Sequence, residues 1–290
     1  MSPTASDQGL QPLEILYAAS DLEAGPTRGA PMPPELVALH GGPFSLPLRP
    51  DRPTIVANFV ATLDGVVALD RAGVTGGGEI SGFSKADRFQ MGLLRALADV
   101  VLVAAGTVRA APTHEWAPRR VARAQAPLLE AWRVGLGLAP QPTTVIVTGT
   151  GRLDPAHPGL SAPDVPVVVA SAPSGADHLA QRPFARHVRV EVLGVGNAVG
   201  SEDLLALFGR LGARIVVCEG GPHLFAQLLA AGLVDELFLS LAPQLVGRAP
   251  DHPRLGLVEG LTFERDQAPW GTLRSVHRAG GLLLLRLGFG

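Results

Sequence analysis

A pair of glycines stands between an apolar segment and a proline in the second half of this sequence, within residues 215–224. Gly220 and Gly221 allow the backbone to approach a phosphate group closely and to adopt φ values that other residues avoid. Pro222 suits the first turn of a helix, where its missing N–H is not needed. The N–H groups and the dipole of such a helix N-terminus attract an anion. Residues 219–222 are therefore predicted to hold a cofactor phosphate; a tight turn that binds no ligand is the alternative.

A second glycine loop follows the apolar residues 100–105, where Gly106 and Thr107 open a turn toward another helix. Thr107 offers a hydroxyl and an N–H group to a phosphate or a ribose. In open α/β sheets, ligands bind in the crevice beyond the carboxyl ends of the strands. Two such loops in one sheet indicate a nucleotide site more strongly than either does alone. The alternative for Thr107 is a helix cap.

Two charged residues near these loops are candidates for contact with a substrate. Asp64 and Gly65 follow the β-rich segment 55–61 and form a predicted turn, in which Asp64 is either a catalytic carboxylate or only a turn residue. Arg95 lies on a predicted helix over residues 84–98, for which Ser84 is the expected N-cap. A guanidinium at that position suits a substrate phosphate. A solvated surface arginine is the alternative.

These residues must be held in place by strands and helices, which are predicted to alternate along the middle of the chain. This order is typical of an α/β fold with a mostly parallel sheet and helices on both faces. Two further strands without a helix between them predict an antiparallel C-terminal edge. Residues 1–52 are predicted to be a partly irregular N-terminal arm with one short apolar element at residues 14–19, and residues 53–290 one domain. The predicted strands are 55–61, 100–105, 144–147, 165–170, 188–192, 214–218, 237–242, 273–277 and 282–287, and the predicted helices are 84–98, 121–134, 203–211 and 222–231, with a glycine-rich loop over 70–82.

The composition excludes several classes of function. The chain has 290 residues, a formal net charge of −2 and no Lys/Arg-rich run, so no electrostatic footprint for nucleic acid is present. No apolar run approaches the roughly 20 residues of a bilayer span, and no secretory signal is evident, so we expect a cytoplasmic protein with no membrane partner. The lone cysteine, Cys218, excludes an internal disulfide and a multi-cysteine zinc site, and is expected to be a small apolar strand residue.

These motifs, in this order and at this spacing, resemble the reductase domain of bifunctional riboflavin-biosynthesis proteins and its stand-alone relatives. Those proteins share the dihydrofolate-reductase-like fold. The resemblance extends from about residue 53 to the end of the chain, with the middle weakly matched. The matching segments are residues 58–65, 81–88, 94–109, 219–224 and 232–237, with Pro243 and Gly247 beyond them.

The resemblance implies NADPH as hydride donor and a ribosylamino-pyrimidine 5′-phosphate as the small-molecule substrate, whose ribose is reduced to a ribityl chain. It implies that Arg95 and Asn58 bind the substrate and that Glu219 lies beside it. It also implies a cis bond between Gly220 and Gly221, a homodimer and no metal. The residues implied to contact or cover the cofactor are Ser81, Gly106, Thr107, Gly220, Gly221, Pro222, His223 and Leu224.

One segment departs from the family pattern, which carries an acidic residue and a proline shortly after the Thr-Val-Arg sequence. Residues 110–116 read Ala-Ala-Pro-Thr-His-Glu-Trp, which weakens the substrate assignment more than the cofactor assignment. The zinc deaminase motif is absent, so deamination on this chain is excluded. A proton must also reach the substrate. Glu219 and Asp64 are the predicted sources; water and the side chains of His114, His223 and His277 are the alternatives.

Two other functions compete with this one. The first is a reductase of the same fold that acts on a pterin or on another carbonyl or imine. Finding Arg95 turned away from the pocket would favour it. The second is a non-catalytic nucleotide-binding protein, because sites rather than folds determine function.

Overall fold

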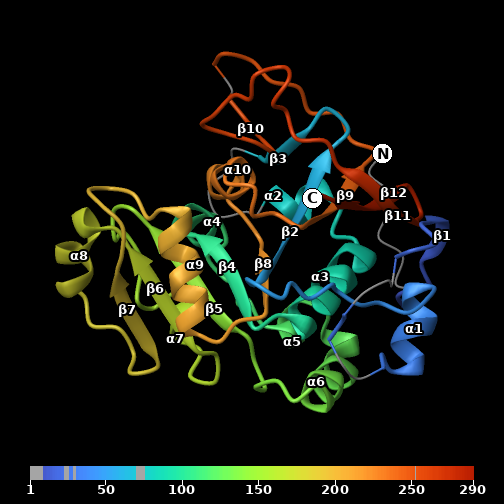
Figure 1. Ribbon diagram of the computed structural model, residues 1–290, viewed down its shortest axis with the longest axis horizontal. Coiled ribbons are helices and arrows are strands. Elements are labelled where there is room, and N and C mark those ends of the chain that lie inside the picture. Colours follow the sequence, from blue (N-terminus) through green and yellow to red (C-terminus); the bar gives the residue numbers. More distant parts are fainter. Residues whose placement is uncertain (1–8, 23–25, 29–30, 70–75, 252) are drawn as a thin grey trace.

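A computed structural model describes residues 9–22, 26–28, 31–69, 76–251 and 253–290 (Figure 1). Its centre is a ten-stranded sheet with the order β1-β11-β12-β9-β2-β8-β4-β5-β6-β7, and β3 and β10 form a separate two-stranded sheet. None of the helices in this part of the chain has the length and apolar character that a bilayer crossing requires. The strands are β1 (Glu14–Ala18), β2 (Thr54–Thr62), β3 (Val66–Ala68), β4 (Val100–Ala104), β5 (Thr143–Thr148), β6 (Val167–Ser171), β7 (Val188–Val192), β8 (Ile215–Cys218), β9 (Glu236–Ala242), β10 (Leu255–Gly256), β11 (Thr272–Ala279) and β12 (Leu282–Gly288).

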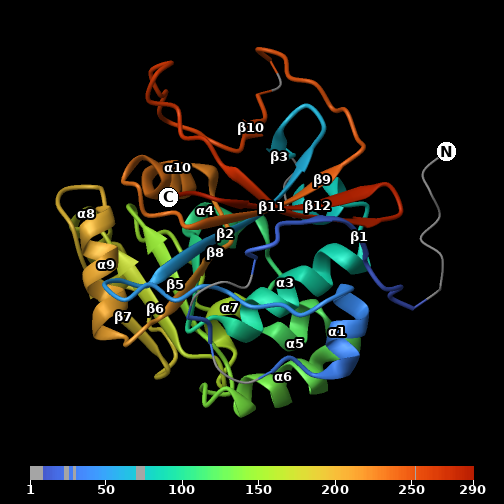
Figure 2. The same cartoon turned by 45° about the vertical axis from the view of Figure 1, so that its right-hand side comes forward.

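The strands from β9 through β2, β8, β4, β5 and β6 to β7 pair parallel. Helices cover both faces of this part of the sheet, so the strands inside it are almost continuously apolar, whereas the edge strand β7 alternates. One hydrophobic core lies between the sheet and α3, and a second lies under α9 and α10. Figure 2 shows α1, α3, α5 and α6 together on one side of the sheet. The helices are α1 (Pro34–His40), α2 (Gly76–Ile80), α3 (Lys85–Leu97), α4 (Ala105–Ala110), α5 (Pro118–Val121), α6 (Ala126–Gly135), α7 (Pro158–Ser161), α8 (Pro173–Ala180), α9 (Ser201–Arg210) and α10 (Pro222–Ala230), with a 3₁₀ turn at Arg123–Gln125.

The antiparallel edge is present as predicted, because β9, β12 and β11 pair antiparallel in succession. Together with the parallel strands from β9 to β7, this confirms the predicted α/β fold class with a mostly parallel sheet. β12 is an interior strand, since it lies between β9 and β11. The sheet ends instead on β1, which belongs to the N-terminal arm and pairs antiparallel with β11.

Two sequence expectations about helices are wrong. The predicted helix over 121–134 is divided, and α6 begins only at Ala126. The cause is Pro127, which is tolerated in the first turn of α6 but would clash with the preceding turn inside a longer helix. The expected loop over 70–82 contains α2, which begins at Gly76; residues 70–75 lie outside the described residues. Gly77 lets α2 pack closely on β2, since a Cβ there would lie 3.3 Å from Val60 Cγ1.

The N-terminal arm is fastened to the domain by buried or half-buried ion pairs. Arg28 donates to both carboxylate oxygens of Asp99. Arg49 and Arg52 both donate to the carboxylate of Asp235, which is 4% exposed and also accepts the backbone N–H of β2 residue Ile55. The arm therefore packs as part of the folded unit.

Candidate active site

The two glycine loops predicted from the sequence lie side by side at the carboxyl ends of the adjacent strands β4 and β8. The Glu219 N–H donates to the Leu102 carbonyl at 2.9 Å, and the Ala104 N–H donates to the Gly220 carbonyl at 2.8 Å. A Cβ at Gly220 would lie 3.2 Å from Thr107 Oγ1. The hydroxyl of Thr107 therefore lies against the glycine loop, and a side chain at Gly220 would press on it.

The glycine loop has the backbone features that a phosphate site needs. Gly220 has a φ of 115°, and its bond to Gly221 is cis, as the resemblance implied. α10 begins at Pro222, and its N-cap residue Gly221 provides no side-chain hydrogen bond to the first turn. The N–H groups of that turn are thus not capped by a side chain, and the helix dipole favours an anion there.

Thr107 is not a helix cap. The N-cap of α4 is Ala104, and Thr107 lies inside the helix, in its first turn. The alternative interpretation of Thr107 is therefore wrong. Its position leaves the hydroxyl facing the loop of the neighbouring strand.

A buried ion pair stands directly beside the glycine loop. Arg95 of α3 has no exposed surface, and it donates Nε–H to Glu219 Oε1 at 2.8 Å and Nη2–H to Oε2 at 2.5 Å. Nη1 donates to the carbonyls of Glu115 and Ala117, and Nη2 also contacts His114 Nε2 at 2.9 Å. All five N–H groups of the guanidinium are engaged. A direct contact between Arg95 and a substrate phosphate requires some of these bonds to be exchanged.

Asp87, in the first turn of α3, is a buried carboxyl group that the sequence did not single out. It is 6% exposed and is hydrogen-bonded to the hydroxyl groups of Ser240 and Ser81. Burial raises the pKa of Asp87 above its usual range, and the negative charge of Glu219 raises it further. An acidic residue in the first turn of a helix is expected from the dipole alone, so no sequence signal distinguished Asp87.

Asp64 joins the end of β2 to the loop that follows β9. Its carboxylate accepts the Thr62 hydroxyl at 2.6 Å and the N–H groups of Val246 and Gly247 at 3.4 and 2.7 Å. The Thr62 hydroxyl is the main cause that lowers the pKa of Asp64, so this group is ionised at neutral pH. The predicted turn is present, since the Gly65 N–H donates to the Thr62 carbonyl. The catalytic role of Asp64 stays a prediction.

The remaining candidates are distributed around this edge of the sheet. Asn58 is 8% exposed on β2, and the parallel register Ala57↔Cys218 places it next to Glu219. Ser81 lies in the turn before α3 and binds Asp87. His223 packs against the loop after β10, because a Cβ at Gly260 would lie 2.6 Å from its Nδ1.

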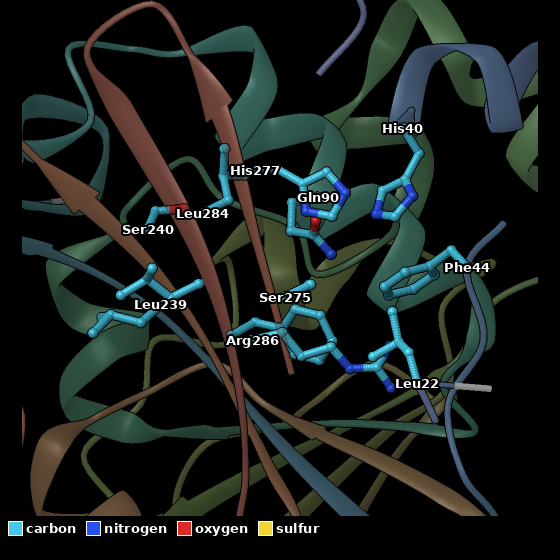
Figure 3. A pocket seen from close by; sticks show the side chains of 12 residues that line it. Leu22, His40, Phe44, Gln90, Leu239, Ser240, Ser275, His277, Leu284 and Arg286 are labelled. Carbon is cyan, nitrogen blue, oxygen red and sulfur yellow. The ribbon is translucent and has the colours of Figure 1, made fainter. Parts of the chain in front are cut away.

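Figure 3 shows a narrow cavity between the N-terminal arm and the antiparallel strands, into which His277 points. The ring of His277 lies 4.6 Å from that of His40, and the Nε2 of Gln90 has no hydrogen-bond partner there. The volume of this cavity is about 10 Å³, close to the minimum for one water molecule. Ser240 lines this cavity and also binds Asp87, so His277 lies behind the predicted site.

Cys218 ends β8 and is fully buried, and burial raises the pKa of its thiol to about 12. The prediction that it is a small apolar strand residue is therefore confirmed.

The strand order, the paired glycine loops and the buried polar cluster define the class of the protein, a reductase-type α/β fold. The RibD C-terminal domain family model matches residues 53–267, so the chain belongs to that family, as its motifs predicted. It is 31% identical over 199 residues to the 2,5-diamino-6-ribosylamino-4(3H)-pyrimidinone 5′-phosphate reductase of Methanothermobacter thermautotrophicus, covering 68% of this chain and 80% of that protein.

Solved structures share the fold. A pyrimidine reductase-like protein from Corynebacterium diphtheriae matches with a TM-score of 0.62 and 19% identity, over 82% of this chain and 92% of that one. The bifunctional deaminase and 5-amino-6-(5-phosphoribosylamino)uracil reductase of Thermotoga maritima matches with a TM-score of 0.60 and 19% identity. That match covers 82% of this chain and 57% of the bifunctional protein.

Proposed function

We propose that this protein is an NADPH-dependent reductase that reduces the ribose of a ribosylamino-pyrimidine 5′-phosphate in riboflavin biosynthesis. The observation that carries the proposal is the contact between Thr107 and the Gly220 loop, next to a buried cluster of carboxyl groups. Family membership and the named activity of the archaeal relative support it.

The residues at the strand ends fit a nicotinamide dinucleotide. The space beside Gly220 would be lost to any side chain, and the uncapped first turn of α10 offers N–H groups to a pyrophosphate. The residues proposed to hold the cofactor are Gly106, Thr107, Gly220, Gly221, Pro222, His223 and Leu224, with Ser81 near the nicotinamide. The bound cofactor supplies the hydride.

Asp87 is the carboxyl group best suited to supply a proton to the substrate. Its raised pKa keeps it protonated nearer to neutral pH than an ordinary carboxyl, and Ser240 and Ser81 fix its position. Glu219 is the carboxylate partner of Arg95, and both of its oxygens accept hydrogen bonds from the Arg95 guanidinium. We propose that Glu219 orients the substrate side of the site, while Asp64 holds the loop after β9 in place.

Arg88 is an exposed cation near this cluster and is available for the substrate phosphate. It is exposed on α3, its guanidinium lies 5.8 Å from the ring of Phe83, and its charge acts on both Asp87 and His114. The full engagement of Arg95 is also the observation that favours the second candidate, a reductase of the same fold with another substrate.

The test measures NADPH oxidation with the ribosylamino-pyrimidine phosphate as substrate. Thr107→Ala should raise the KM for NADPH about tenfold through loss of one hydrogen bond to a charged group. Asp87→Asn should lower kcat by about 100-fold or more with little change in either KM. Thr113→Ala, an exposed position, is the matched control. Turnover of a pterin or another imine, but not of the pyrimidine, would establish the second candidate instead.

We also propose that the protein is a homodimer located in the cytoplasm, where NADPH is supplied. The support is the edge strand β1, whose Ile15, Leu16 and Tyr17 are 44%, 48% and 45% exposed. An edge strand presents unpaired backbone N–H and C=O groups with which another chain can pair. Light scattering should give twice the mass of one chain, and a single-chain mass would contradict the dimer.

A further inference from the structure

The contact between Arg95 and His114 determines which ring nitrogen of His114 carries the proton. Arg95 Nη2 lies 2.9 Å from His114 Nε2. A guanidinium only donates hydrogen bonds and has no lone pair to accept one. His114 Nε2 must therefore be the acceptor, and the proton of the neutral ring is on Nδ1.

The ring is held neutral and in place by its surroundings. Burial lowers the pKa of His114 to about 3, and the adjacent Arg95 charge contributes. The ring packs edge-on against Trp116, with centroids 5.1 Å apart. The carbonyls of Glu115 and Ala117 also accept from Arg95, so the backbone after His114 is fixed to the same guanidinium. At neutral pH His114 cannot act as an acid, which removes it as a source of the proton.

The Nδ1–H group of His114 is available to a ligand. Within the described part of the chain it has no hydrogen-bond partner, and the side chain is half-buried. The nearby Arg88 is exposed and its charge acts on the ring. A fixed neutral donor and an exposed cation therefore lie near each other.

We propose that His114 determines substrate binding by donating its Nδ1–H to an oxygen of the substrate phosphate, with Arg88 providing the neutralising charge. This inference rests on the proposed function for its substrate class. In it, Arg95 and Glu219 are positioning residues, because they set the tautomer of His114 rather than contact the phosphate. The departure of residues 110–116 from the family pattern then has a functional consequence, because it introduces this histidine into the segment.

The first measurement needs no activity. Nitrogen NMR of protein labelled in histidine, with His114→Gln used to assign the signal, should show a protonated Nδ1 and an unprotonated Nε2 from neutral pH down to about pH 5. The opposite tautomer, or an imidazolium in that range, would overturn the inference.

The second measurement compares two variants that each preserve one nitrogen's role. The amide of His114→Asn occupies the position of Nδ1 and keeps a donor for the ligand, although it is too short to reach Arg95. The amide of His114→Gln reaches the position of Nε2 and keeps the acceptor for Arg95, but has no donor at Nδ1. Calorimetry would measure binding of ribose 5-phosphate, with ribose as the ligand without phosphate.

We expect His114→Gln to weaken ribose 5-phosphate binding about tenfold or more, and His114→Asn to stay within about threefold of the natural protein. Thr113→Ala should bind as the natural protein does, and ribose should bind all four proteins equally weakly. Equal losses in the Asn and Gln variants would indicate a structural role only and overturn the inference, as would no loss in the Gln variant or no ribose 5-phosphate binding at all.

A different result would separate this inference from the proposed function. If the expected tautomer and the expected pattern of ribose 5-phosphate binding are found but the pyrimidine substrate is not reduced, His114 is confirmed as a phosphate ligand and the proposed substrate is wrong. If the pyrimidine is reduced and His114→Gln raises its KM without changing kcat, both stand.

Discussion

The buried pair of Arg95 and Glu219 makes the strongest single prediction about stability. Glu219→Gln keeps the shape of the side chain but removes its charge and one of its two acceptor oxygens. The new amide group would point a donor at a guanidinium whose exposed surface is zero. The buried cation would then lack its counter-charge.

Removal of one partner from a buried ion pair typically costs about 3–5 kcal/mol, because the remaining charge is neither paired nor hydrated. Arg95 keeps three neutral acceptors, the carbonyls of Glu115 and Ala117 and the Nε2 of His114, which lessens the loss. We therefore expect Glu219→Gln to reduce the free energy of unfolding by about 3 kcal/mol. That is a large part of the roughly 5–15 kcal/mol of a typical domain.

Urea unfolding of the single and double variants would measure this loss. Arg95→Met alone should cost a similar amount, because it leaves the Glu219 carboxylate buried and unpaired. The double variant should cost at least about 2 kcal/mol less than the sum of the two single variants. Glu115→Gln is the control, since its partner Arg120 is 47% exposed and such a pair contributes about 1 kcal/mol or less. A loss below about 1 kcal/mol for Glu219→Gln, or strict additivity, would refute the reasoning.

Three further predictions concern stability and the cofactor loop. Burial lowers the pKa of His40 to about 4 and of His114 to about 3, so the unfolded chain binds more protons below its histidine pKa of 6.5. The contribution of these two histidines to the free energy of unfolding should be constant above about pH 6.5 and should decrease as the pH falls below that value. At pH 4 the loss from His40 alone should be about 3 kcal/mol. Acid unfolding followed by circular dichroism would measure it. Gly220→Ala should raise the KM for NADPH, because its Cβ enters the space beside Thr107 Oγ1. Gly82 also has a positive φ, 61° against 115° for Gly220, but a Cβ there would have no neighbour within 4 Å, so Gly82→Ala should change only stability. Asp235→Asn should make the N-terminal arm sensitive to limited proteolysis, since the carboxylate binds two arginines of that arm; unchanged cleavage would contradict this role.

The sequence allowed most of the domain to be predicted because parallel strands covered on both faces are almost continuously apolar. β7 coincides with the predicted 188–192, and α10 begins at the predicted Pro222. Glycine and proline signals located both loops of the site, since their backbone demands are local. The division of the helix at Pro127 followed from the same kind of local rule, which the apolar pattern over residues 121–134 obscured.

The partners of the charged residues could not be predicted, because they are set by tertiary contacts. Arg95 and Glu219 are 124 residues apart in sequence, and the helix pattern alone does not show that Arg95 faces the end of β8. The burial of Asp87 depends on Ser240, which belongs to a strand far along the chain. The short apolar element expected at residues 14–19 is β1, but its strand pairing could not be predicted, since five exposed residues acquire strand structure by pairing with β11.

The charge balance of the site indicates what kind of substrate it accepts. Arg95 and Glu219 neutralise each other, and Asp87 and His114 are held toward their neutral forms by burial. Arg88 is then the exposed charge of this group, and it is positive. A neutral pterin would gain no charge–charge interaction with that cation, whereas a phosphorylated sugar would pair with it. The electrostatics of the cluster thus favour an anionic substrate, although Arg95 itself is unavailable to bind it. Arg88→Gln should therefore weaken binding of ribose 5-phosphate more than binding of ribose, and equal effects on both ligands would argue against the phosphorylated substrate.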